Sequence, residues 1–345
     1  MRLRALDCVV QPGVVPAAVH AVDRALAGEV AAGGRGVLHV ATLAGDVVAL
    51  GRFHRRPAGG GDVALLRRRG GGRVAAAGTG FVQVALHLPH AAALVADEAA
   101  ALAPAQVLNR AVRGLLGACD ALGVPAQYPG RDVVTVGGRV LAVLGFDVAP
   151  DGATIVEAVL AVGRDQSALA ALLERVDPAG VVPAAMVLPG DTVALAAACG
   201  RVPSLDDIVA ALARGFAARL DVALGPPAPA PIGTTADDAP WLDARRPRPA
   251  LRGRARCASQ LGVVDVAAAC AADGTLAAVE VSGDLLAPAH AIARLEARLG
   301  GAPPRLADVR AVVAATLAPP DGFVLGVGVD ALADAIVAAA RGAGA

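Results

Sequence analysis

The sequence contains no lysine, so arginine supplies all 31 of its basic side chains. Arginine stays charged in proteins and is a poor nucleophile, and the chain therefore has no side chain suited to amine chemistry. Aromatic residues are also scarce, at 2% of 345 residues, although hydrophobic residues make up 56%. We expect a core built from small aliphatic side chains.

The sequence also lacks an excess of charge and a long apolar run. The formal net charge is +0 and the isoelectric point is near 7.0, which gives no electrostatic basis for binding nucleic acid or an anionic membrane. No uncharged apolar stretch reaches the roughly 18 residues of a membrane span. The first residues form no apolar signal-peptide segment either, so we expect no membrane partner.

Cysteines are few and dispersed, and none forms a C-x-x-C pair. They are Cys8, Cys119, Cys199, Cys257 and Cys270. An odd, scattered set is typical of reduced thiols, and we expect a cytoplasmic protein.

The chain is long enough for two domains, and its composition changes between them. Residues 226–250 are rich in proline, contain the single tryptophan and show no hydrophobic period, which predicts a linker. The prediction is a domain over 1–225, this linker, and a second domain over 251–345.

Both domains mix helical and strand-like patterns. In the first, helices are predicted over 16–30, over 104–122 and after Ser204, and strand-like runs are Gly36–Thr42, Asp46–Phe53, Phe81–Leu88, 132–136, 139–145 and 154–162. Ala44-Gly45 predicts a hairpin between the first two runs, and the alternation in Phe81–Leu88 predicts a half-buried strand. In the second, Asp273-Gly274 predicts a hairpin, followed by helices over 288–299, 305–317 and beyond Asp330. An α+β fold is expected.

The first candidate site is the run Arg67-Arg68-Arg69-Gly70-Gly71-Gly72-Arg73-Val74, which precedes a strand. Consecutive glycines allow backbone N–H groups to approach a phosphate or carboxylate, and the arginines supply positive charge. Taken alone, such a run is more often a solvated turn.

The second candidate site is the hairpin around Gly137-Gly138. Asp132 leads one strand and Arg139 opens the return strand, so pairing across the hairpin is expected to bring the two together. A cross-strand salt bridge without function is the simpler interpretation.

In this order the segments resemble the biotin/lipoate protein ligase superfamily. Val47–His54 is similar to the family's V-x-L-G-R-x-Q strand, and Arg67–Val74 to its R-R-x-[ST]-G-G-x-x-V loop. Asp132 matches the Asp of its N-D pair, and Arg139 stands where the family has lysine in G-x-K-[IVL]-[AS]-G. Val279–Leu286 and the helix after it resemble the accessory domain that follows some lipoate ligases.

The resemblance implies a class II synthetase-like mixed sheet flanked by helices, plus a small α+β C-terminal domain. It implies an ATP-dependent ligase, with Mg²⁺ left open, that condenses lipoate or octanoate in an apolar tunnel. The acyl group then passes to a lysine of a lipoyl carrier domain or the glycine-cleavage H protein. By resemblance the acyl-adenylate is lined by Arg67, Arg68, Gly70, Gly71, Gly72, Arg73 and Val74. Asp132 is placed at the nucleotide and Arg139 at the lysine position.

The sequence departs from the family pattern at four positions of this site: Arg139 for lysine, Ala142 for glycine, Arg131 for asparagine and Gly70 for serine or threonine. Two functions stay open. One is a ligase in which Arg139 replaces the lysine electrostatically. The other is a catalytically impaired binding protein of the same fold that holds lipoyl or octanoyl groups or a lipoyl carrier domain.

Other candidate residues give weaker signals. A superfamily route through a cysteine thioester is disfavoured, because residues 126–129 contain no cysteine and Cys119 lies on an apolar helix face. His87 and His90 have no third ligand nearby in the sequence, so no metal site is predicted. Asp284 is expected to cap a helix, and the direction of the Glu157 side chain is not predicted.

Overall fold

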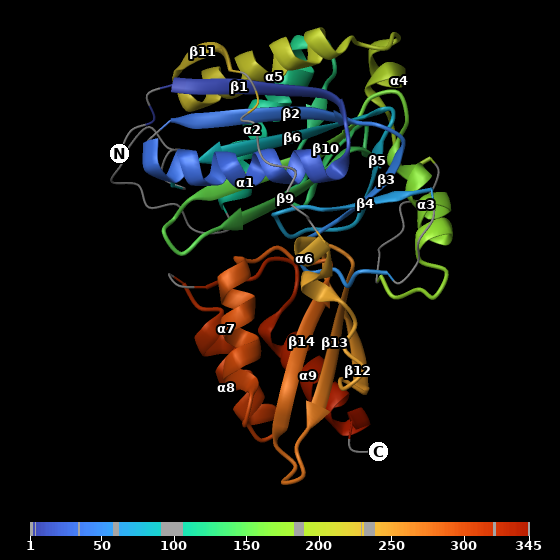
Figure 1. The fold of residues 1–345 in the computed structure, drawn as a ribbon, viewed down its shortest axis with the longest axis vertical. Helices are drawn as coiled ribbons and strands as arrows, with labels where there is room; N and C mark the ends of the chain where they lie inside the picture. The colour runs from blue at the N-terminus through green and yellow to red at the C-terminus, as the bar shows by residue number, and fades with distance from the viewer. Residues whose placement is uncertain are drawn as a thin grey trace.

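The computed structural model describes residues 3, 5–33, 35–57, 62–90, 106–182, 190–228, 230, 239–319 and 322–343. Its largest element is a mixed eight-stranded sheet (Figure 1). In spatial order the strands are β11 (Ala223–Ala228), β1 (Ala5–Val14), β2 (Gly36–Leu43), β6 (Phe81–Leu88), β10 (Thr154–Ala161), β9 (Arg139–Val148), β8 (Val133–Val136) and β7 (Ala126–Gln127). The first three strands run parallel and the others antiparallel.

Helices cover both faces of this sheet (Figure 1). Helix α1 (Pro16–Gly33) packs on one face against β2 and β6, and helices α2 (Gln106–Ala121) and α5 (Leu205–Leu220) pack together on the other. The start of α5 is fixed by Ser204, whose side chain accepts from Asp207 N–H in a capping box. The predicted α+β fold is therefore confirmed.

The predicted hairpin around Ala44-Gly45 is wrong. Strand β3 (Asp46–Leu50) leaves the main sheet and forms the centre of a separate three-stranded sheet with β4 (Ala64–Arg67) and β5 (Ala75–Gly78). Strand β2 already has β1 and β6 as neighbours, so no edge remains for β3. The short elements η2 (Gln166–Ala168) and α3 (Leu169–Val176) pack against this small sheet, and α4 (Leu195–Cys199) precedes α5 in the chain.

Strand β6 is buried on both faces and not half-buried as predicted. Its apolar even-numbered residues pack on α2 and α5, whereas its odd-numbered residues face the side covered by α1. Two polar side chains, Gln83 and His87, therefore enter a second interior beneath α1.

The C-terminal domain has the predicted hairpin and helices. Its sheet contains β12 (Gly253–Ala258), β13 (Val263–Cys270) and β14 (Leu276–Gly283), and its helices are α7 (Ala289–Leu299), α8 (Leu306–Thr316) and α9 (Val329–Ala343). They enclose a separate aliphatic core, which also receives Phe53 from the first domain. No helix in the described residues is long and apolar enough to cross a bilayer.

The proline-rich segment is not a structureless linker in its described parts. It begins inside β11, and after residues 231–238, which lie outside the described residues, it forms α6 (Ala239–Leu242) and η3 (Asp243–Arg245). Trp241 stacks on His20, with ring centroids 5.0 Å apart, and donates to the carbonyl of Arg67 at 2.8 Å. These contacts anchor the segment between the domains (Figure 1).

Candidate functional site

The glycine-rich loop between β4 and β5 uses its backbone donors from residue 68 to residue 73 inside the protein. From residue 68 to residue 73, each N–H donates a hydrogen bond of 2.5 to 3.4 Å. The acceptors are, in loop order, the carbonyl of Leu50, both carboxylate oxygens of Glu157, the carbonyls of Phe146 and Leu285, and the carboxylate of Asp132. No backbone N–H from residue 68 to residue 73 is left for a bound phosphate or carboxylate.

The glycines are required by the packing of this loop. A Cβ on Gly70 would lie 2.6 Å from the backbone nitrogen of Phe146, and one on Gly71 would lie 2.4 Å from the carbonyl oxygen of Leu285. Gly72 has φ +96°, a conformation that residues with a Cβ rarely adopt. Close backbone contacts within the protein therefore explain the triple glycine without a ligand.

Arg67 is held by backbone carbonyls. Its guanidinium donates to the carbonyls of Arg52 at 3.0 Å, His54 at 2.6 Å and Leu242 at 3.0 Å. Burial, and then the neighbouring cation Arg245, lower the pKa of Arg67 to about 9. Its donors connect the loop to the segment between the domains instead of pointing to a ligand site.

Arg68 is fully buried and only partly satisfied. Its Nη2 donates to the carbonyl of Arg73 at 2.5 Å, while Nε and Nη1 have no hydrogen-bond partner among the described residues. Burial lowers the pKa of Arg68, and the carboxylate of Glu157 is the first of the charges that oppose this effect. Arg68 and Glu157 are therefore interior counter-charges.

Asp132 is paired with Arg73, the last arginine of the loop. The guanidinium donates through Nε at 2.8 Å and Nη2 at 2.7 Å to the two carboxylate oxygens, and Asp132 is fully buried. The glycine loop and Asp132 therefore meet as the sequence predicted. Their mutual hydrogen bonds occupy the guanidinium and carboxylate groups that would otherwise be available to a ligand.

The predicted approach of Asp132 and Arg139 is wrong. The register of β8 and β9 pairs Arg139 with Val136, next to the turn, whereas Asp132 accepts the N–H of Leu144 through its carbonyl. The two residues therefore lie at opposite ends of the hairpin, and Arg139 is exposed.

Glu157, whose direction the sequence did not reveal, faces the loop from the centre of β10. Its carboxylate accepts from the N–H groups of Arg69, at 3.2 Å, and Gly70. Burial raises the pKa of this carboxyl, while Arg68 and the two N–H groups oppose the rise. The carboxyl group of Glu157 thus occupies the position that the glycine loop would offer to a bound anion.

The C-terminal domain closes over the same loop. Besides the bond from Gly72 N–H to the carbonyl of Leu285 at 2.7 Å, the N–H of Ala289 donates to Asp147 at 2.8 Å. Asp284 does not cap a helix as predicted: its carboxylate lies 3.1 Å from Nε2 of His54 and accepts from Val263 N–H at 2.9 Å.

A buried ion-pair cluster holds this interface. Arg55, which is 1% exposed, extends from the first domain to Glu280, at 2.7 Å, and to Asp265, both on the C-terminal sheet. The next residue, Arg56, forms a more exposed pair with Asp243.

The cavities next to the loop are small. One of about 10 Å³ lies between α1 and the sheet and is lined by polar groups that include His20, Gln83 and Glu157. A second, of about 50 Å³, lies beside Arg69 and His87. Pockets for small organic ligands usually have about 300–1,000 Å³. The larger hollows found in the described part of the chain, such as that of about 410 Å³ beside Ile208, are not lined by the glycine loop.

Comparison with solved structures decides the fold. LipL1 of P. falciparum, solved in complex with lipoate, superimposes with a TM-score of 0.63 over 90% of this chain and 94% of its own, at 11% identity. The chain has the fold of a lipoate protein ligase. A bi-partite lipoate protein ligase of Thermoplasma acidophilum also matches this lipoate ligase fold, with a TM-score of 0.51 over 72% of this chain and 100% of its own, at 15% identity. No protein-family model matches the sequence, and no curated protein is detectably similar to it.

The structure assigns another role to Val74, which the resemblance placed at the ligand. Val74 is a core residue, 1% exposed, beneath the small sheet. Cys119 is also a core residue, and burial raises the pKa of its thiol to about 12, as expected for a structural cysteine.

A group of buried polar residues escaped the sequence analysis. Asp23, His39 and His87 lie together beneath α1, whereas only His87 had been considered, with His90. They are separated by 16 and 48 positions, and only strand register brings them together. The sequence signal that could have revealed this group is that α1, β2 and β6 each carry one of these polar residues on a face that is mostly apolar.

Proposed function

We propose that this chain uses the lipoate ligase fold for binding and not for ligation, and that its ligand is a carrier domain of the lipoyl type. The observation that carries the proposal is the occupation of every backbone N–H from residue 68 to residue 73 by acceptors of the protein itself. Adenylate formation needs donors around the phosphate and the acyl carbonyl, and this loop has no backbone N–H between residues 68 and 73 to offer.

ATP with or without Mg²⁺ does not fit the residues present. The carboxylate of Asp132 is engaged at both oxygens by Arg73, and the carboxyl group of Glu157 takes the N–H groups of Arg69 and Gly70 that a phosphate would need. No lysine exists to contact the acyl carboxylate and the α-phosphate, and Arg139 lies at the exposed end of its hairpin.

The cavities that the described residues form beside the loop do not fit lipoate or octanoate either. Both are far smaller than an ordinary ligand pocket, and the one below α1 mixes charged and amide groups with apolar residues such as Val19 and Leu66. With the small ligands disfavoured, the carrier domain remains. The T. acidophilum ligase of this fold was solved as part of a lipoylation system with its E2 lipoyl domain.

A ligase that forms the acyl-adenylate and passes the acyl group to a carrier lysine is the second candidate. It is supported by the fold, which matches a lipoate-bound ligase along 90% of this chain, and by the meeting of the glycine loop with Asp132. It requires withdrawal of the C-terminal domain from Gly72 and displacement of Glu157 from the loop.

Two measurements on the full chain separate the candidates. Lipoate- or octanoate-dependent exchange of pyrophosphate into ATP is expected to equal the no-acid control in wild type and in Arg139→Lys, with Arg131→Lys as the matched exposed control. Isothermal titration with an apo lipoyl domain is expected to show saturable binding. Exchange above the control supports the ligase, and absence of both exchange and binding overturns the binding proposal.

A further inference from the structure

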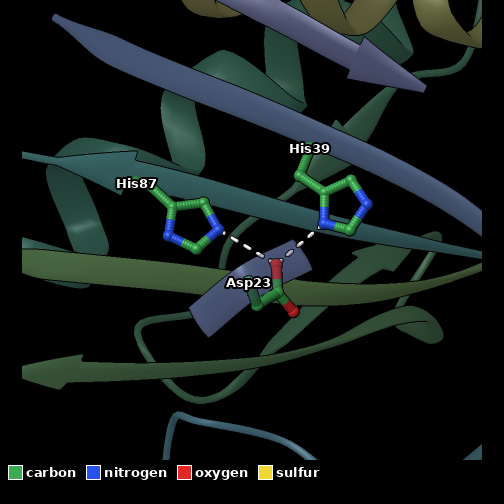
Figure 2. A group of neighbouring side chains, drawn as sticks. All are labelled: Asp23, His39 and His87. Carbon is green, nitrogen blue, oxygen red and sulfur yellow. Dashed lines mark hydrogen bonds and ion pairs between the residues drawn. The ribbon is translucent and has the colours of Figure 1, made fainter. Parts of the chain in front are cut away.

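Three side chains from three different elements converge beneath α1. Figure 2 shows the rings of His39, from β2, and His87, from β6, pointing at the carboxylate of Asp23, from α1. His39 Nδ1 lies 2.7 Å and His87 Nε2 lies 3.0 Å from the same oxygen, Oδ1. The side chains are between 2% and 7% exposed, and their potential ligand atoms all lie within 4.8 Å of one another.

Strand register makes this meeting a fixed property of the fold. His39 pairs with Ala85 on β6, two residues before His87, so both imidazoles emerge on the face that α1 covers. Asp23 comes from the buried side of α1, where Val22 and Leu26 pack on the same sheet. The positions of all three ligand groups are therefore set by packed, regular elements.

From this geometry we propose that Asp23, His39 and His87 bind one divalent transition-metal ion of the Zn²⁺ or Fe²⁺ class. Two imidazoles and one carboxylate form a ligand set that suits such ions. Nitrogen and oxygen ligands about 2.0–2.2 Å from a tetrahedral ion lie roughly 3.4 Å apart. Here the two nitrogen–oxygen separations are 2.7 and 3.0 Å, and all three ligand atoms lie within 4.8 Å of one another. Only small side-chain movements are needed to admit the ion.

The hydrogen bond on the far side of His39 supports this proposal. Its Nε2 lies 2.9 Å from Oε1 of Gln11, an acceptor. Ligand histidines usually donate their second N–H to such an acceptor, which leaves the first nitrogen free to coordinate. A neutral His39 with its proton on Nε2 would turn the Nδ1 lone pair towards Asp23 Oδ1, and a cation between the two atoms makes this contact favourable.

Gln83 provides an independent observation. Its side chain is 8% exposed, and its Nε2 has no hydrogen-bond partner in the described part of the chain. It lines the cavity of about 10 Å³ that Asp23 and His39 also line, a volume close to that of one water molecule. A water completing the metal coordination there would accept this unused N–H.

The ion's role follows from its burial. A site enclosed between α1, β2 and β6 has no room for a substrate, so the metal would join α1 to the main sheet as a structural ion. This proposal is independent of the one for carrier binding, because that proposal rests on the backbone donors of residues 68–73, none of which donates to Asp23, His39 or His87.

The test is titration of the full chain, stripped by a chelator, with Co²⁺ as a spectroscopic probe and with Zn²⁺. We expect one equivalent of Co²⁺ to produce visible absorption typical of a four- or five-coordinate nitrogen and oxygen site, and Zn²⁺ to displace it and raise Tm. Asp23→Asn and His87→Gln, close in shape to the native residues, are each expected to weaken Co²⁺ binding at least about tenfold. His290→Gln, in the C-terminal domain, is the control and is expected to bind as wild type.

The wild-type titration alone can overturn the proposal, so a variant that fails to fold does not obscure the outcome. Absence of stoichiometric binding of either ion by folded wild-type protein would show that the three residues form only a hydrogen-bonded network. Binding that persists unchanged in both folded variants would place the ion elsewhere and would equally overturn it.

Discussion

Arg73 and Asp132 hold each other through two parallel hydrogen bonds of 2.8 and 2.7 Å at the point where the glycine loop meets the β8–β9 hairpin. The pair joins two segments that the sequence had assigned to a bound nucleotide. Its geometry satisfies both side chains without a ligand. The following predictions test whether the polar groups around this loop serve the fold or a reaction.

Asp132→Asn should lower the free energy of unfolding by about 3 kcal/mol, because it leaves the buried guanidinium of Arg73 without its counter-charge. Arg139→Ala should change it by less than about 0.5 kcal/mol, because Arg139 is exposed. Urea unfolding followed by circular dichroism measures both. Equal effects of the two substitutions would contradict the separation of these residues along the hairpin.

Arg55→Ala should destabilise the junction between the domains by about 1.5–3 kcal/mol, because it removes a buried guanidinium that donates to both Glu280 and Asp265. Arg256 stays 3.3 Å from Asp265 and Arg248 stays 3.8 Å from Glu280, so each carboxylate keeps a cation nearby. Arg56→Ala, at the next position, removes a partly exposed pair with Asp243 and should cost about 1 kcal/mol or less. Thermal unfolding and limited proteolysis of the two variants provide the comparison. A larger loss in Arg56→Ala would show that the junction depends on other contacts.

Glu157→Gly should convert the glycine loop into an anion site. It frees the N–H groups of Arg69 and Gly70 and removes the counter-charge of Arg68, so pyrophosphate should bind and raise Tm by about 2 °C. Glu157→Gln keeps an acceptor oxygen and is the matched control, expected to show no shift, as for wild type. Stabilisation of wild type by pyrophosphate would mean that Glu157 does not block the loop.

His20 should give the protein an acid-sensitive step. Burial, and then the charge of Arg69, lower the pKa of His20 from 6.5 to about 4. The unfolded chain therefore takes up a proton that the folded chain refuses, and stability is lost as pH falls from 6.5 towards 4. Allowing for solvent screening, the loss is about 1–2 kcal/mol.

Replacement of His20 by phenylalanine keeps a ring against Trp241 and removes this proton. Unfolding followed by the fluorescence of Trp241, the single tryptophan, should show a smaller loss between pH 6.5 and 4 in the variant than in wild type. Parallel pH profiles would contradict the assignment.

Most of the local structure could be predicted from the sequence. The capping box at Ser204, the hairpin at Asp273-Gly274 and the amphipathic patterns of α5 and α7 depend on residues close together in the chain, so their elements appeared as predicted. The resemblance also led to the correct fold, which the match to LipL1 confirms. The glycine loop and Asp132 also lie in contact.

Long-range pairing was beyond this kind of reasoning. The tight turn at Gly45 suggested a hairpin, but β2 was already paired on both edges, which no local pattern reveals. Likewise, the spacing of Asp132 and Arg139 in the sequence did not reveal which residues pair across the hairpin. The strands pair Arg139 with Val136 next to the turn, with a bulge between Val134 and Thr135, and Asp132 lies at the far end. The buried group of Asp23, His39 and His87 depends on the same unknown register.

The backbone donors of the glycine loop from residue 68 to residue 73 are already occupied within the protein. Hydrogen–deuterium exchange of residues 68–73, with and without ATP and octanoate, measures this directly. We expect strong protection of these N–H groups in the free protein and no change on adding both ligands. Rapid exchange in the free protein, with protection gained only when ATP and octanoate are present, would contradict the account.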